Sequence, residues 1–185
     1  MKFRMAMHAR TGIAAVVMAT SAAATLSILG PAGAGGDKIA FPENYAGGVM
    51  YMTFDHAATK TFRELYTSAA AAAAAKKGEP LPSGTVITMV NYAVKHDAQG
   101  NPEKDASGHF IKTDTIAGYG VMEKRTGWGT EYPDNVRNGE WEYQVFKADK
   151  TVNTGAKLSA CYECHKPQDK QDFVFSYEKL KTAAK

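Results

Sequence analysis

The stretch TVITMVNYAV, residues 85–94, decides the fold class. β-branched and other apolar residues fill it, and a loop rich in Pro and Gly at 79–84 comes directly before it. This composition predicts a β-strand rather than a helix. Alternate residues of a strand point to opposite faces, so Ile87, Met89 and Asn91 are expected on one face and Val90 on the other.

Three further segments share the strand pattern. They are the apolar run at 47–54, the longer segment 110–123 and the alternating stretch 141–146. Within the second of these, Gly118 and Gly120 indicate a β-bulge or a close approach of another group. The sequence therefore predicts an antiparallel sheet of four or five strands.

Residues 57–77 predict a helix that packs on this sheet. Phe62, Leu65 and Tyr66 follow helical spacing, a run of alanines continues the segment, and Gly78 can end it. The expected fold class is α+β, a mainly antiparallel β-sheet with one or two packed helices.

The first 34 residues have the composition of a secretory signal peptide. Lys2, Arg4 and Arg10 precede an uncharged apolar stretch, and residues 32–34 are small enough for cleavage. A retained membrane anchor is the alternative, because the apolar stretch is about long enough to span a bilayer. We expect cleavage, export to the periplasm and a single mature domain over 35–185.

The leader also accounts for the formal net charge of +3. It contains three of the 22 basic residues and no acidic residue, which leaves 19 basic and 19 acidic residues in the remainder. Binding to nucleic acid or to an anionic membrane needs a clustered basic surface. The neutral balance argues against both classes of partner.

The chemistry lies near the C-terminus, in the stretch CYECH at 161–165. This is the Cys-x-x-Cys-His pattern of c-type haem attachment. Two thiols at this spacing can form thioethers to the two vinyl groups of one haem, and the adjacent imidazole can ligate its iron. We therefore expect one covalent haem c, held by Cys161 and Cys164 with His165 as the proximal iron ligand, in a C-terminal haem c attachment segment.

Three other uses of the two cysteines remain open: a redox dithiol, part of a zinc site, and a simple disulfide. A redox dithiol would be expected within a βαβ pattern, which the sequence lacks. A zinc site would need a second pair of ligands, and the chain has no other cysteine.

The sixth position of the iron is expected to be open. No Met or His follows His165, so any sixth ligand must come from upstream, and an open position binds small molecules. The upstream candidates are Met50, Met52, Met89, Met122, His56, His96 and His109.

The motif and several upstream segments resemble the cytochrome P-460 family and its cytochrome c′-beta branch. They occur in the family's order and extend over essentially the whole mature chain. The matching stretches are FPENY at 41–45, FR at 62–63, GTV at 84–86, GVME at 120–123, WEYQVF at 141–146, ACYECHK at 160–166, Asp169, Lys170, Asp172 and FVF at 173–175.

The resemblance implies a mostly antiparallel β fold, a homodimer and a five-coordinate haem in the periplasm. In cytochrome P-460 a Lys on the strand that begins Gly-Thr-Val bonds to the haem macrocycle, and this bond accompanies hydroxylamine oxidation. The corresponding position here falls at or near Met89, and 88–91 contains no Lys. The c′-beta branch lacks the bond and binds nitric oxide and carbon monoxide at an apolar distal face, which Met89 would suit as distal wall.

Two more residues match family positions near the distal pocket. Arg63, on the predicted helix, could neutralise a haem propionate or steer a polar ligand, or it could be a solvated helix residue. Glu123 could carry a proton on the distal side, or it could be a surface carboxylate beside Lys124.

Three functions follow. The first is an exported mono-haem cytochrome that binds nitric oxide or a similar small molecule at an open distal site. The second is an enzyme that oxidises hydroxylamine or nitric oxide, with Glu123 and Arg63 as candidate catalytic residues. The third is periplasmic electron transfer, which needs a redox partner protein and a Met or His as sixth ligand.

Overall fold

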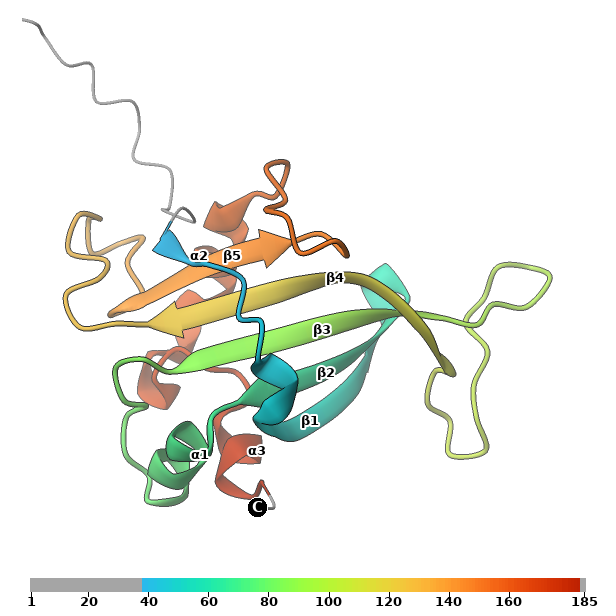
Figure 1. Cartoon of the computed structure of the whole chain (residues 1–185), viewed down its shortest axis with the longest axis horizontal. Coiled ribbons are helices and arrows are strands. Elements are labelled where there is room, and N and C mark those ends of the chain that lie inside the picture. Colours follow the sequence, from blue (N-terminus) through green and yellow to red (C-terminus); the bar gives the residue numbers. More distant parts are fainter. Residues whose placement is uncertain (1–37, 184–185) are drawn as a thin grey trace, which may run out of the picture.

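A five-stranded antiparallel sheet forms the centre of the computed structural model, which describes residues 38–183 (Figure 1). Sheet order follows chain order, and each neighbouring pair is antiparallel. The strands are β1 (Val49–His56), β2 (Thr61–Thr67), β3 (Val86–Val94), β4 (Lys112–Lys124) and β5 (Trp141–Phe146). The predicted α+β class is confirmed, whereas the predicted signal peptide lies outside the described residues.

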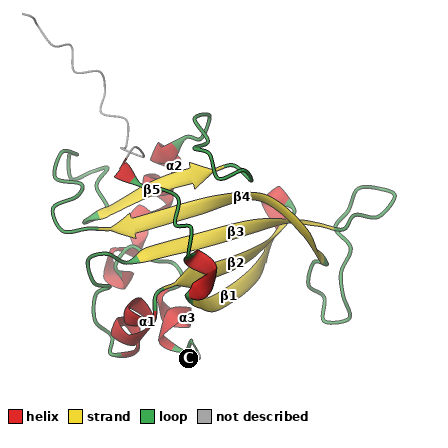
Figure 2. Ribbon diagram, viewed as in Figure 1, coloured by secondary structure: helices red, strands yellow, loops and turns green. Residues whose placement is uncertain are grey.

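Short helices surround the sheet (Figure 2). They are α1 (Ala69–Lys76), α2 (Leu158–His165) and α3 (Tyr177–Lys181), with short 3₁₀ helices η2 (Tyr45–Gly47), η3 (Ala57–Thr59) and η4 (Lys166–Gln171). The helices α1 and α3 pack against each other. Over 38–183, no helix is both long and apolar enough to cross a membrane.

The predicted helix over 57–77 is wrong in its first half. Residues 61–67 form β2, and the helix begins only after Ser68, whose side chain accepts a hydrogen bond from the Ala71 amide at 3.1 Å. The apolar residues of 61–67 fit helical spacing, but they also lie on both faces of an interior strand, where each is at least half-buried. Arg63 therefore lies on a strand rather than on a helix.

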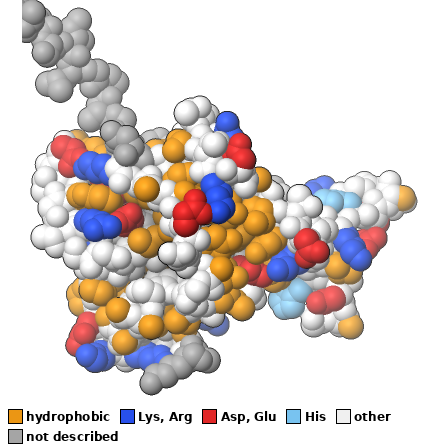
Figure 3. All heavy atoms as spheres, viewed as in Figure 1, with side chains coloured by type: hydrophobic (Ala, Val, Ile, Leu, Met, Phe, Trp, Pro, Cys, Tyr) orange, Lys and Arg blue, Asp and Glu red, His pale blue; other side chains and the backbone are white. Residues whose placement is uncertain are grey.

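The link between β3 and β4, residues 95–111, projects from the body as a hairpin with charged and histidine side chains on its surface (Figure 1, Figure 3). At the base of this hairpin β4 bends. A register shift beside Gly118 marks the bend, which agrees with the bulge predicted there.

Strand register divides the sheet into two faces, because directly opposed residues of antiparallel strands point the same way. One face, here called the C-terminal face, carries Ile87, Met122 and Tyr143, and the last two helices pack on it. The other, here called the N-terminal face, is covered by residues 38–47, which cross in front of the sheet in Figure 1. Each face has its own hydrophobic core.

Candidate functional site

The Cys-x-x-Cys-His motif occupies the last turns of α2, at the edge of β5. Tyr162, the first of the two residues between the cysteines, fixes this helix to the sheet. Its ring packs on Tyr143 with centroids 4.7 Å apart, and its backbone carbonyl accepts a hydrogen bond from the Asn138 side chain at 3.0 Å. The motif is thus docked through its own buried tyrosine.

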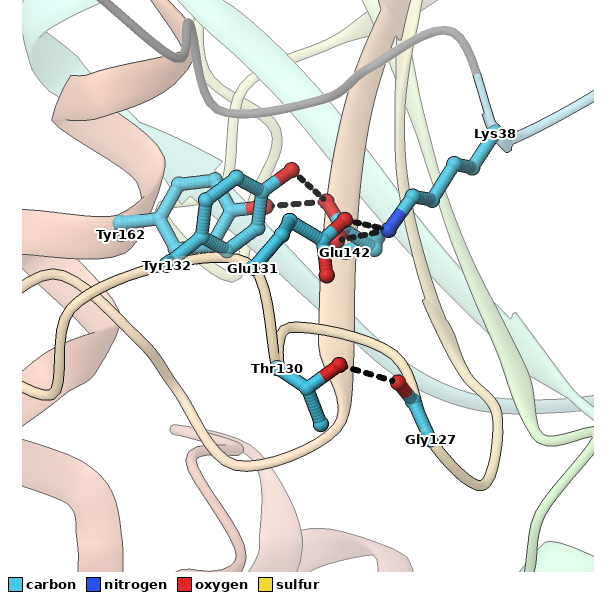
Figure 4. A network of polar contacts seen from close by, with 7 residues as sticks. All are labelled: Lys38, Gly127, Thr130, Glu131, Tyr132, Glu142 and Tyr162. Carbon is cyan, nitrogen blue, oxygen red and sulfur yellow. Dashed lines mark hydrogen bonds and ion pairs between the residues drawn. The ribbon is translucent and has the colours of Figure 1, made fainter.

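Figure 4 shows the polar side of this docking. The hydroxyl of Tyr162 donates to the carboxylate of Glu142, which is fully buried. Tyr132 donates to the same carboxylate at 3.3 Å, and Lys38 lies 3.3 Å from it while also pairing with Glu131. A buried carboxylate with several donors is stabilised where an unpaired one would be costly. The network links α2, β5 and the start of the described chain.

His165 is held by one strong hydrogen bond. Its Nδ1 lies 2.7 Å from the backbone carbonyl oxygen of Phe173, so Nδ1–H donates and Nε2 keeps its lone pair. The rings of Tyr143 and Phe175 flank the imidazole at 5.0 and 5.2 Å. Burial lowers the pKa of His165 and favours the neutral form that ligates a metal.

The thiols fit haem attachment better than the other uses of the pair. Both cysteines are free, Cys161 half-buried and Cys164 exposed. Burial, with Cys164 nearby, raises the pKa of the Cys161 thiol, whereas a redox dithiol needs a lowered one. In the described part of the chain, no three His, Cys, Asp or Glu side chains gather closely enough to hold a metal ion.

A row of five cross-strand partners runs over the C-terminal face, here called the apolar row. All but the buried Leu65 are only half-buried, although the face is otherwise packed. The row consists of Met52, Leu65, Met89, Gly120 and Val145. It lies two residues along β5 from Tyr143, or about 7 Å from the ring beside His165.

A second row on the same face is partly polar. Phe54, Arg63, Asn91 and Gly118 oppose one another across the strands. Arg63 Nε and Asn91 Oδ1 are buried and hydrogen-bond to no described residue. Burial also lowers the pKa of the Arg63 guanidinium, which still remains cationic.

These features fit a haem. The porphyrin is flat and apolar, as the half-exposed apolar row requires, and its propionates are anions that the half-buried Arg63 could pair with. Gly120 keeps the surface low, since a Cβ there would come within 3.0 Å of Met89 Cε. Cys161, Cys164 and His165 would hold the group, with Arg63 beside it.

The structure separates the predicted distal residues. Met89 lies at the centre of the apolar row and Arg63 in the adjacent row, so these two share the face of His165. Glu123 does not. It opposes Val86 and Glu142, points to the N-terminal face, and pairs with Arg125 at 2.5 Å. Glu123 therefore lies on the opposite sheet face from Met89 and Arg63, and its distal proton-carrier role stays a prediction.

The structure also places the candidates for a sixth iron ligand in different parts of the molecule. Met52 and Met89 belong to the apolar row, and His56 opposes Thr61 at the hairpin end of the same face. The other histidines, His96 and His109, lie in the projecting hairpin, where His109 pairs with Asp55.

The sequence did not single out Asn91 or the carbonyl of Phe173. An Asn amid apolar strand residues was the available indication for the first. The second depends on a tertiary contact between residues 165 and 173, which no local pattern encodes.

A groove of about 380 Å³ lies on the other flank of α2, between the helix and the loop that contains Val136. Ser159, Tyr162, Glu163 and Lys166 line it from the helix. Helical spacing places these residues away from Cys161, Cys164 and His165, so the groove is distinct from the candidate haem site.

Comparison with known proteins relates the chain to a protein family. No curated protein matches the chain. The family model described as Cytochrome P460 matches residues 42–176, which include every strand, the whole of α2 and both rows on the C-terminal face. The family implies haem binding and explains the Cys-x-x-Cys-His motif together with the surface beside it. The chain belongs to the cytochrome P460 family.

Proposed function

We propose that this protein is an exported c-type cytochrome that binds nitric oxide or a similar small neutral molecule at an open distal site. One haem would be attached through thioethers to Cys161 and Cys164, with His165 as the proximal ligand. The observation that carries the proposal is the apolar row beside His165, in which none of the five residues is charged.

Different residues of the chain would bind the haem, retain it and select the ligand. The hydrogen bond from His165 Nδ1–H to Phe173 leaves Nε2 free for a metal, and the thioethers would prevent loss of the group after export. When bound, haem supplies an iron with an exchangeable sixth position. An apolar surface around Met89 disfavours anions and strongly hydrated molecules, because their desolvation there would be uncompensated. Neutral diatomic gases carry little such cost.

Electron transfer is the second candidate, favoured by two observations. Met52 and Met89 both lie on the apolar row, so a thioether could fill the sixth position. The ring of Phe175, 53% exposed, lies beside His165 and offers a surface for a redox partner protein. The enzymatic alternative has less support, because the apolar row has no Lys and Glu123 lies on the other face.

Absorption spectra test these readings. The haem-loaded protein is expected to show high-spin five-coordinate iron in both oxidation states, and carbon monoxide should shift the ferrous spectrum at once. A low-spin ferrous spectrum that carbon monoxide changes only slowly would favour Met ligation and electron transfer instead. A colourless secreted protein would refute haem attachment, while steady turnover of hydroxylamine with an artificial electron acceptor would favour the enzyme.

The homodimer implied by the resemblance is also a proposal, and an open sheet edge supports it. Of the described residues, only those of β2 pair with β1, and Met50 at this edge is 51% exposed. The opposite edge is bridged by Val152 and contacted by α2. Open edges invite pairing with a second copy, and Lys discourages it. Met50→Lys should therefore shift the sedimentation of the protein from dimer to monomer, and a wild-type monomer would refute the proposal.

A further inference from the structure

Two consecutive residues that follow the haem motif adopt a backbone conformation that is unfavourable for L-amino acids. Asp172 has φ 52° and Phe173 has φ 60°, both in the left-handed region. For residues other than Gly this costs on the order of 1 kcal/mol each, and it persists only where the surroundings impose it. Such strain is concentrated at functional sites, so its local cause is informative.

The carboxylate of Asp172 is held by an ion pair and by a hydrogen bond from a backbone amide. Lys124 Nζ lies 2.8 and 2.9 Å from its two oxygens, and the Leu81 amide donates to one of them at 2.8 Å. Both side chains of the ion pair are nearly buried, at 11% and 14% exposure. Lys124 is itself fixed at the end of β4, where its backbone pairs with Thr85 and Gly84. The strained turn is thus anchored to the sheet.

Phe173 is also held in place, through its backbone and its ring. Its amide donates to the Gln168 carbonyl at 2.8 Å, and its ring lies against Gly139, where a Cβ would come within 3.0 Å of Phe173 Cε2. Its carbonyl is the acceptor for His165 Nδ1–H at 2.7 Å. The anchored turn therefore fixes the position of the Phe173 carbonyl oxygen, which orients the imidazole of His165.

We propose that the Lys124–Asp172 ion pair is a positioning device for the proximal ligand, holding the strained turn so that the Phe173 carbonyl keeps its hydrogen bond to His165. The inference rests on the proposed role of His165 as iron ligand. An acceptor at Nδ1 makes an imidazole a stronger donor at Nε2, so the pair tunes the metal without touching it. Lys124 and Asp172 are positioning residues, since neither contacts the imidazole.

The test uses haem-loaded Asp172→Asn and Asp172→Gly. The Asn variant keeps the shape and removes the charge, while Gly adopts the left-handed conformation without strain and removes the carboxylate. In both, we expect haem to stay attached, the ferrous iron–histidine stretching band in the resonance Raman spectrum to move to lower frequency, and the midpoint potential to rise. Both shifts follow from a weaker hydrogen bond at Nδ1.

Lys112→Met is the matched control. It breaks another partly buried ion pair, Lys112–Glu64, whose carboxylate lies on the N-terminal face of the same sheet. This variant should lose stability and leave the stretching band and the potential unchanged.

The outcomes separate two failures. A wild-type protein without haem refutes the proposed function itself. A haem-loaded wild type whose band and potential are matched by both Asp172 variants overturns only the role of the ion pair. Loss of folding in both Asp172 variants, with Lys112→Met intact, would also overturn it, because the pair would then be a general fold determinant.

Discussion

Met89 and Gly120 oppose each other at the centre of the apolar row, and their sizes are matched. A Cβ at Gly120 would lie 3.0 Å from Met89 Cε, so the Met side chain fills the space that Gly leaves. Met is flexible enough to shift for one methyl group, but a branched side chain needs more room.

Gly120→Val should accordingly reduce the free energy of unfolding by about 1–3 kcal/mol, the usual cost of overpacking. It should also slow carbon monoxide binding, because Met89 is pushed out over the candidate haem surface. Denaturant unfolding and flash photolysis measure the two effects. Gly47→Ala is the control, since a Cβ there meets nothing within 4 Å. Equal unfolding energies for Gly120→Val and wild type would argue against the close approach.

Replacing Met89 by Lys tests whether this position lies beside the haem. The family resemblance places a cross-linking Lys at or near this residue, and the structure places Met89 on the face of His165. Met89→Lys should produce an intact mass that is short of hydrogens and a red-shifted Soret band. Met89→Leu should show neither change. An unaltered spectrum for the Lys variant would mean that Met89 lies away from the macrocycle.

The candidate site was predictable in part from single residues. The motif at 161–165 carries its own spacing and needs no tertiary information. The face of Glu123 could not be predicted, because a side chain's face depends on strand register and a shift of one residue reverses it. Asn91 was on the predicted face of its strand, but its unpaired oxygen appears only once Arg63 is placed opposite it.

At the scale of elements, the strands were predicted to within a few residues and the helix was half wrong. Residues 61–67 are buried or half-buried on both faces, so their apolar positions match a helical period as well as a strand. Ser68 before the alanine run was the available indication that the helix begins there. No comparable signal in the sequence predicts α2, since Lys157 before it provides no side-chain cap and the contacts of Tyr162 are tertiary.

Removing the hydroxyl of Tyr162 should loosen this docking. Tyr162→Phe takes one donor from the buried Glu142 and should lower the free energy of unfolding by about 1–3 kcal/mol. Thermal or denaturant unfolding of the haem-loaded protein gives the value. Thr130→Val removes an exposed hydrogen bond, to the Gly127 carbonyl in the same network, and should cost no more than about 0.5 kcal/mol. Equal losses in the two variants would contradict the role of Glu142 as anchor of α2.

A second prediction at this scale concerns the ion pair between Glu64 on β2 and Lys112 on β4. Burial raises the pKa of Glu64, but hydrogen bonds from Lys112 and Tyr66 outweigh burial, and the net effect is a pKa below the usual 4.5. The unfolded chain then binds more protons just below pH 4.5. The pair's stabilisation is therefore complete above that pH and is lost as pH falls through the lowered pKa.

Glu64→Gln should flatten this acid dependence. The wild-type protein is expected to lose unfolding free energy more steeply than the variant as pH drops below about 4.5. Above pH 6 the variant should be the less stable of the two, because it leaves Lys112 without its partner. Unfolding curves from pH 3 to 7 provide the comparison, and parallel pH profiles would contradict it.

At the scale of the whole molecule, the two ends of the described chain cover opposite faces of one sheet. Residues 38–47 close the N-terminal face with Ile39 and Phe41, and the C-terminal helices cover only part of the other. Which face each end covers is a long-range property that local patterns do not encode. Because the coverage is uneven, the apolar row stays half-buried. A bound haem would cover this row and would therefore stabilise the folded protein.

That stabilisation becomes measurable when the two cysteines proposed to tether haem are replaced. In Cys161→Ser/Cys164→Ser, any haem held by the apolar row and His165 binds reversibly, so the folded state gains stability with haem concentration. The gain should reach about 2.7 kcal/mol when free haem is 100 times its dissociation constant. Melting temperatures over a haem titration would reveal it, whereas a wild type that carries the proposed covalent haem should not respond. Adding His165→Ala to the double variant should remove most of the gain. A double variant whose melting temperature ignores haem would mean that the C-terminal face does not form the binding surface.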